Sequence, residues 1–264
     1  MTYFESIILA IIEGLTEFLP VSSTGHMIIG TALMGIEPTA FVKLFTIVIQ
    51  LGTILSVLVL YWKRFFKSMH FYYKLVVAAI PASILGLAFN DLIDSLLESP
   101  LMVAVMLVVG GVVLLFVDKW FNKPTIENSD NISYKQSFMI GLYQCLALIP
   151  GTSRSASTIV GGMTQNLTRK AAAEFSFFLA IPMMLGASVV KLYKFVKEGH
   201  SFTGEEINLL VVGNIVGFIV AIIAIKSFID ILTRYGFKVF GWYRIVVGLV
   251  IIALLLSGNS LQII

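Results

Sequence analysis

Long apolar runs separated by short polar segments make up almost the whole chain. The runs approach the ~20 residues that a helix needs to cross a bilayer. They therefore predict six membrane-spanning helices, at residues 43–62, 74–90, 101–117, 171–193, 207–229 and 242–257. Residues 118–135, rich in Asn, Pro, Ser, Asp and Lys, are the one substantial polar loop between these runs.

Two further apolar stretches are each interrupted by a proline and continue in small hydroxyl residues. The interruptions lie at Pro20 and Pro150. Proline cannot continue the hydrogen-bond ladder of a helix, and the pieces on either side are too short to span a bilayer. Each stretch therefore predicts a re-entrant helical hairpin. The predicted pieces are residues 4–19 and 21–36 in the first hairpin and 136–149 and 151–167 in the second.

The order of elements repeats, because each hairpin is followed by three spans. Matching segments support this repeat: Pro20 with Pro150, Leu-Ile-Asp94 with Phe-Ile-Asp230, and Val-Val-Gly110 with Val-Val-Gly248. Three crossings are an odd number, so the second half enters from the opposite side, and the repeats should have inverted topology. We expect an all-α polytopic membrane protein with a single transmembrane domain over 1–264. It comprises repeat 1 at about 1–117, the polar loop 118–135 and repeat 2 at about 136–264.

The composition agrees with a membrane protein and limits the classes of partner that are expected. The chain is 58% hydrophobic and 12% charged, whereas soluble domains carry about 25% charged residues. Membrane lipids are therefore expected neighbours. No loop combines a long basic run with flexible polar sequence, which argues against a nucleic-acid partner. The N-terminus lacks a basic region and a small-residue cleavage site, so we expect no removable signal peptide.

The distribution of basic residues predicts an orientation. Thirteen of the eighteen Lys and Arg residues fall in loops 63–74, 118–135, 168–170 and 226–244, and four lie on the other side. The positive-inside bias makes these four loops cytoplasmic and places both termini outside. The hairpins then enter from opposite sides, so their tips can meet. The remaining basic residue, Arg154, lies in the second hairpin.

The hairpin tips combine groups suited to an anion. A charge at a helix centre in a bilayer costs about 2.5–3.5 kcal/mol, so such groups need a partner or a ligand. A helix that restarts after a proline offers free N–H groups and a positive dipole end. Arg154 adds a planar fork that fits phosphate oxygens. We expect a phosphate or diphosphate ligand, bound by Ser22, Thr24, Ser153, Arg154, Ser155 and Thr158.

The first hairpin also carries groups suited to catalysis. Glu13 and Glu17 are spaced i, i+4 and share a helix face, where a divalent cation, Mg²⁺ or Ca²⁺, would relieve their repulsion. His26 follows Ser23 by about one helical turn and can reach its hydroxyl or a bound phosphate. A Ser/His/Glu set can act as nucleophile, base and orienting group. Two glutamates are also consistent with the proton relay of a transporter.

At these residues the chain resembles the undecaprenyl-diphosphatase family, the bacitracin-resistance type of bacterial membrane phosphatase. Two segments carry the resemblance: Glu-Gly-Leu-Thr-Glu-Phe-Leu-Pro-Val-Ser-Ser-Thr-Gly-His at 13–26 and Pro-Gly-Thr-Ser-Arg-Ser-Ala-Ser-Thr at 150–158. The resemblance implies hydrolysis of undecaprenyl diphosphate on the outer face of the bacterial cytoplasmic membrane, which recycles the lipid carrier of peptidoglycan synthesis. It further implies that a divalent cation takes part and that activity depends on Glu17, Ser23, His26 and Arg154, with Glu13 assisting.

Several questions stay open at this stage. We favour Ser23 as nucleophile with His26 assisting, while attack by His26 or by water remains an alternative. Inverted repeats with broken helices are also transporter architecture, so a flippase for undecaprenyl phosphate is the second functional hypothesis. Gln50 and Asn90 are expected to line the cavity. The sequence leaves a homodimer, the identity of the metal and the lipid-chain specificity undecided.

Overall fold

The computed structural model describes residues 1–64, 69–97 and 99–257. Within these residues the secondary structure is helical, and an isolated parallel bridge between Ile126 and Leu167 is the one β contact. The α-helices of the first half are α1 (Tyr3–Thr16), α2 (Ser23–Met34), α3 (Ala40–Val48), α4 (Gln50–Leu60), α5 (Met69–Ala88), α6 (Asn90–Leu97) and α7 (Pro100–Trp120). Those of the second half are α8 (Tyr134–Gln144), α9 (Arg154–Thr164), α10 (Arg169–Lys197), α11 (Gly204–Tyr235) and α12 (Lys238–Leu256).

Six segments in the described part of the chain are long and apolar enough to cross a membrane. They are the nearly continuous pair α3–α4, spanning Ala40–Leu60, together with α5, α7, α10, α11 and α12. These are the six spans predicted from the apolar runs, so the multi-pass helical class is confirmed. The helices α1, α2, α8 and α9 have 14 residues or fewer, too few for the ~20 that cross a bilayer.

The structure corrects the predictions for two segments. Residues 90–97, expected as part of an external loop, form the short helix α6 between α5 and α7. The segment 226–244, predicted as a loop, is helical over most of its length, because α11 runs to Tyr235 and α12 begins at Lys238. Lys226 and Arg244 therefore lie within helices and not in a cytoplasmic loop. Residues 65–68 of the predicted basic loop lie outside the described residues.

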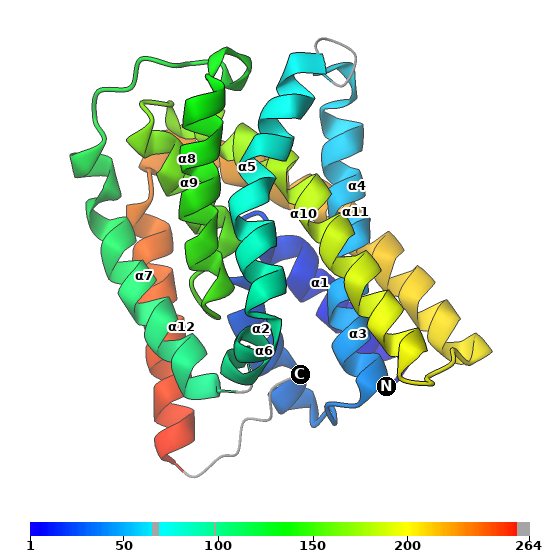
Figure 1. Ribbon diagram of the computed structural model, residues 1–264. Coiled ribbons are helices and arrows are strands. Elements are labelled where there is room, and N and C mark those ends of the chain that lie inside the picture. The colour runs from blue at the N-terminus through cyan, green and yellow to red at the C-terminus, as the bar shows by residue number, and fades with distance from the viewer. Residues whose placement is uncertain (65–68, 98, 258–264) are drawn as a thin grey trace.

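The two pairs of short helices occupy opposite ends of the molecule. Figure 1 shows α8 and α9 in the half that contains the loop between α7 and α8, and α1 and α2 in the other half. Each first helix packs closely on a long helix from the other half of the chain, α1 on α11 and α8 on α5. Glycines permit both approaches, because an added Cβ at Gly14 would meet Gly217 O of α11 at 2.9 Å and one at Gly141 would collide with Ala78 O of α5.

The largest group of buried apolar residues surrounds the first break and α10. Phe18, just after α1, is fully buried and makes an edge-to-face contact with Phe177 of α10, with ring centroids 5.3 Å apart. Phe177 in turn packs near Phe228 of α11. Aromatic pairs of this kind add to the packing of buried apolar area. This packing anchors the break between α1 and α2 to the long helices on which the site is built.

Candidate active site

The first break has a defined backbone conformation. The helix α1 ends at Thr16 with Glu17 as its C-cap, and α2 begins at Ser23. Between them Ser22 adopts φ 68° and ψ 96°, a region that residues other than glycine rarely occupy. The start of α2, with its free N–H groups, lies at a cavity that Ser22, Ser23 and Thr24 help to line.

The second break repeats this conformation. A short 3₁₀ segment at Cys145–Leu148 follows α8, Gly151 has φ 89°, and Ser153 adopts φ 75° and ψ 116° directly before α9. The Ser153 hydroxyl accepts the N–H of Ala156 at 3.2 Å and so caps α9. Arg154 is the first residue of α9, the same position that Ser23 holds in α2.

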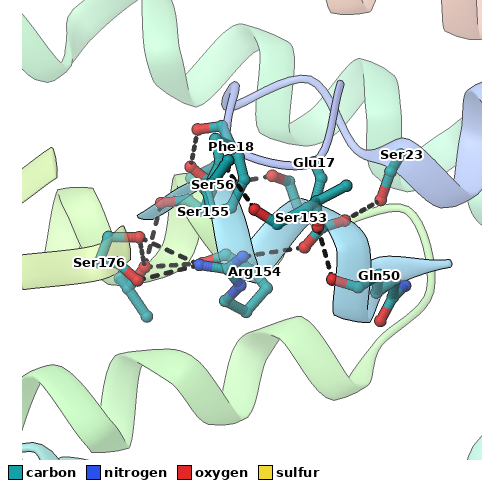
Figure 2. A network of polar contacts seen from close by, with 12 residues as sticks. Glu17, Phe18, Ser23, Gln50, Ser56, Ser153, Arg154, Ser155 and Ser176 are labelled. Atoms are coloured by element: carbon teal, nitrogen blue, oxygen red, sulfur yellow. Dashed lines mark hydrogen bonds and ion pairs between the residues drawn. The ribbon is translucent and has the colours of Figure 1, made fainter. Parts of the chain in front are cut away.

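The two breaks meet at Glu17, as Figure 2 shows. The Ser23 hydroxyl donates a hydrogen bond to Glu17 Oε2 at 2.6 Å, and Arg154 Nη2 pairs with Glu17 Oε1 at 2.8 Å. The Glu17 side chain is 7% exposed. An ion pair buried to this extent requires good geometry and further hydrogen bonds to offset its desolvation. One carboxylate thus brings the predicted hydroxyl and the predicted guanidinium together.

Further hydrogen bonds fix Arg154 from its other side. Its Nη1 donates to the main-chain oxygen of Ser176 in α10 at 3.0 Å, and its guanidinium lies 6.0 Å from the Phe18 ring. Ser155 donates to Phe18 O at 2.6 Å, while Thr158 and Ser176 share a hydrogen bond of 2.6 Å. The hydroxyls of Ser155 and Thr158, expected to bind phosphate, therefore hydrogen-bond to the protein itself. Sequence reasoning missed Ser176 because its contact with Arg154 depends on how α9 packs on α10.

Glu13 is the second carboxylate of the site. It is 1% exposed and interacts with Glu17 and Gln50, while its Oε1 atom has no hydrogen-bond partner. Two adjacent carboxylates with a free buried oxygen are a suitable donor set for a hard divalent cation, which can take its remaining ligands from phosphate and water. Across the described residues, no group of three or more His, Cys, Asp or Glu side chains could hold a metal by itself. The residues present therefore fit a cation shared with a phosphate ligand.

His26 lies beside the site, and the hydrogen bonds of its ring go to Ser22 and Tyr243 and not to Ser23. Its Nδ1 is 2.8 Å from Ser22 O, and its Nε2 is 2.7 Å from the hydroxyl of Tyr243 in α12. Because a carbonyl can only accept, Nδ1 carries the proton and Nε2 accepts from Tyr243. The two rings stack, with centroids 5.5 Å apart and planes 4° apart. The reach from His26 to Ser23 that the spacing suggested is thus not made in this structure.

A cavity of about 270 Å³ opens onto both breaks. Its polar wall contains Glu17, Gln50 and Arg154 together with the hydroxyl residues Ser22, Ser23, Thr24 and Ser153. Its apolar wall consists of Ile93, Ala147, Leu148, Met183, Met184 and Ala187. The prediction that Gln50 lines the cavity is confirmed, whereas Asn90 is not among the lining residues. A lining that combines charged and apolar side chains suits a ligand with an anionic head and a hydrocarbon chain.

Fold and site together define a class: a multi-pass helical membrane protein with a charged site between two broken helix pairs. The family described as "Bacitracin resistance protein BacA" matches residues 6–250. The chain belongs to this family.

Curated relatives agree over nearly the full length. A protein of Flavobacterium johnsoniae named undecaprenyl-diphosphatase is 58% identical, with 96% of each chain covered. Proteins of the same name from Porphyromonas gingivalis and Aquifex aeolicus are 55% and 44% identical; the first alignment covers 100% of both chains, the second 97% of this chain and 100% of its relative. The family resemblance seen in the two motif segments is thereby confirmed.

Proposed function

We propose that this protein hydrolyses undecaprenyl diphosphate to undecaprenyl phosphate and inorganic phosphate, and that the cavity between the breaks is its active site. The observation that carries the proposal is Glu17, which holds the hydroxyl of Ser23 and the guanidinium of Arg154 at one point. A nucleophile, a proton acceptor and an oxyanion-binding cation are the groups that phosphoryl transfer needs. Membership of the BacA family supports the same reaction.

The reaction follows from these positions. Ser23 Oγ attacks the terminal phosphorus while its proton passes to Glu17 Oε2, the acceptor of its hydrogen bond. The bond from phosphorus to the bridging oxygen breaks, and undecaprenyl phosphate leaves with the electron pair. Water then attacks the phosphoserine, releases inorganic phosphate and restores the hydroxyl. Arg154 and the N-terminal N–H groups of α2 and α9 bind the phosphate oxygens.

His26 assists at the edge of this site. Its contact with Ser22 O ties the imidazole to the residue before Ser23, and Tyr243 fixes its orientation. In this arrangement neither ring nitrogen is free to attack, which favours Ser23 over His26 as the nucleophile. His26 would act on the phosphate or on the attacking water once Tyr243 releases Nε2.

Glu13 and Glu17 would hold the divalent cation, Mg²⁺ or Ca²⁺. Bound there, the cation would offset the negative charge of the diphosphate beside two carboxylates. The Oε1 atom of Glu13 has no hydrogen-bond partner, so it would be available as a ligand to the cation. Gln50, which interacts with Glu13 and itself lines the cavity, would hold that carboxylate in place beside Glu17.

We further propose an inverted repeat in the cytoplasmic membrane, with the site opening to the external side. Two symmetric features support it. The pairs α1–α11 and α8–α5 each join the first hairpin helix of one half to the second span of the other. Ser22 and Ser153 hold matching conformations before α2 and α9. The basic loops between spans favour a cytoplasmic location of the 118–135 loop. A homodimer stays a prediction.

The decisive experiment is phosphate release by purified protein in detergent, supplied with Mg²⁺ or Ca²⁺ and a short isoprenyl diphosphate. We expect turnover by the native chain and its loss in Ser23→Ala. Folded native protein that releases no phosphate would exclude the enzyme and leave the flippase as the hypothesis to test in vesicles. Parallel acid and alkaline quenches with a radiolabelled terminal phosphate should trap an adduct on Ser23 that survives acid, whereas phosphohistidine would survive only the alkaline quench. An adduct on His26 would indicate attack by histidine, and none would indicate direct attack by water.

A further inference from the structure

Arg244 is a fully buried arginine in α12 whose partners are all main-chain oxygens. Its Nη1 donates to Pro20 O at 3.2 Å and Thr152 O at 3.0 Å. Its Nη2 donates to Gly151 O at 2.9 Å and Met106 O at 3.0 Å, and its Nε to Leu107 O at 3.3 Å. These five bonds use the full donor capacity of a guanidinium. None of the acceptors is a carboxylate, so Arg244 is not half of an ion pair.

The acceptors identify what Arg244 connects. Pro20 lies in the first break, Gly151 and Thr152 lie in the second, and Met106 and Leu107 belong to α7. A helix break leaves carbonyl groups without the N–H partner that the next helical turn would supply. In an apolar surrounding each unsatisfied carbonyl is costly. Arg244 satisfies both breaks with one side chain and thereby holds them against the same part of α7.

The helix α7 leaves space for this guanidinium. An added Cβ at Gly110 would collide with Arg244 Nη2, and one at Gly111 would come within 2.8 Å of Gly241 O in α12. The two helices therefore cross at main-chain distance beside Arg244. Such a close crossing limits the freedom of the arginine side chain. The position of its five donors is therefore set by the packing of α7 against α12 and not by the breaks.

We infer that Arg244 is a positioning residue that fixes the two breaks relative to each other, an inference that rests on the proposed roles of Ser23 and Arg154. Ser23 follows Pro20 by three positions and Arg154 follows Thr152 by two, so little chain separates each reactive group from the carbonyl that Arg244 holds. A displacement of about 1 Å in an active site can cost ~10²-fold in rate. Arg244 keeps the hydroxyl and the phosphate-binding guanidinium at one phosphate without touching the substrate.

Arg244→Lys tests this inference, because lysine keeps the charge but offers three donors in place of five. We expect kcat to fall by about 10²-fold with little change in KM. Hydrogen exchange measured by mass spectrometry should rise in peptides covering 18–26 and 149–157 and stay native elsewhere. The matched control is Arg234→Lys, whose exposed ion pair with Asp230 lies at the end of α11. It should leave turnover and exchange unchanged.

The outcomes separate the inference from the proposed function. Native exchange in both peptides, a uniform rise along the chain, or native kcat in Arg244→Lys would each overturn the positioning role. Arg244→Ala with added guanidinium provides a second measurement, since a small cation that fills the vacated space should restore part of the turnover. Absence of rescue in folded Arg244→Ala protein would also count against the role. Absence of phosphate release from the folded native chain would overturn the proposed function whatever Arg244 does, and native turnover in Ser23→Ala would overturn only the role of Ser23.

Discussion

Ser22 and Ser153 share one unusual backbone conformation, with φ of 68° and 75°. Each directly precedes the first residue of a helix, Ser23 in α2 and Arg154 in α9. The two helices therefore present different groups from equivalent positions, a hydroxyl from one and a guanidinium from the other. Because Glu17 accepts a hydrogen bond from both, the candidate site exists only where the two breaks meet.

Arg154→Lys should separate charge from geometry. Lysine retains the cation but cannot donate to Glu17 and Ser176 from one planar fork. Loss of one donor to a developing oxyanion typically costs about 10²–10³ in kcat, and we expect a loss of this size in phosphate release. Thermal unfolding and gel filtration would verify that the variant folds. Near-native turnover in folded protein would contradict the role given to Arg154.

Glu13→Gln should weaken the binding of the divalent cation. The amide keeps the shape of the side chain but removes one of the two adjacent carboxylates that would hold the cation. We expect the half-saturating metal concentration to rise by about 10-fold or more. Two readouts apply: a metal titration of phosphate release, and the metal-induced increase in melting temperature. The exposed Glu37→Gln serves as control, and an unchanged titration in Glu13→Gln would place the metal elsewhere.

Tyr243→Phe should test how His26 is oriented. The ring still stacks, but the hydroxyl that donates to Nε2 is lost. A net hydrogen bond of about 1 kcal/mol corresponds to roughly fivefold, and we expect kcat to fall by this amount. Native kcat in the folded variant would contradict the orienting role given to Tyr243. Tyr193→Phe, at an exposed position of α10, is the matched control.

Gly14→Val and Gly141→Val should both destabilise the protein. In each case a side chain would meet the main chain of a long helix from the other half, and overpacking typically costs about 1–3 kcal/mol. We expect a lower melting temperature in detergent for both variants. Gly186→Ala, where an added Cβ meets no atom within 4 Å, should melt at the native temperature or above it. Native melting in both valine variants would refute the close helix contacts.

Cysteine labelling should test the proposed orientation. In a Cys145→Ser background, Glu37→Cys and Glu127→Cys place single thiols at exposed positions near opposite ends of the bundle. A membrane-impermeant maleimide should label residue 37 in intact cells and residue 127 only after permeabilisation. The reverse pattern would show that the bundle is inserted the other way round.

The spans were predictable from sequence because a bilayer leaves few alternatives to a long apolar helix. The helix α6 was missed because its eight residues include several polar side chains and lie between two long apolar runs, where a loop is expected. Glu17, Ser23 and Arg154 were candidates from the sequence, because the proline breaks and the cost of buried charge pointed to them, but their meeting at one carboxylate depends on how the helices pack. Phosphate ligation by Ser155 and Thr158 was expected from their motif, yet local packing directs both hydroxyls to protein oxygens.

Arg244 and Tyr243 could not be assigned from the chain alone. Arg244 falls at the edge of an apolar run and was counted with a basic loop, although it lies within α12. Its carbonyl partners lie between 92 and 224 positions away in the sequence. The partner of His26 was missed for a similar reason: spacing places an imidazole on a helix face but does not choose among the acceptors around it. The carbonyl oxygen of Ser22 lies outside α2 because its residue has a positive φ, and it accepts a hydrogen bond from His26 Nδ1.

The ion pair between Glu17 and Arg154 has a consequence for the end of each reaction cycle. When no phosphate is bound, the guanidinium already has a carboxylate as counter-ion. In the proposed reaction an entering diphosphate would compete with that carboxylate for the guanidinium, and a departing phosphate would be replaced by it. Glu17 thus competes with the product for Arg154, which lowers the affinity for inorganic phosphate. A site that binds a diphosphate tightly during the reaction can in this way release inorganic phosphate without a large movement of the protein.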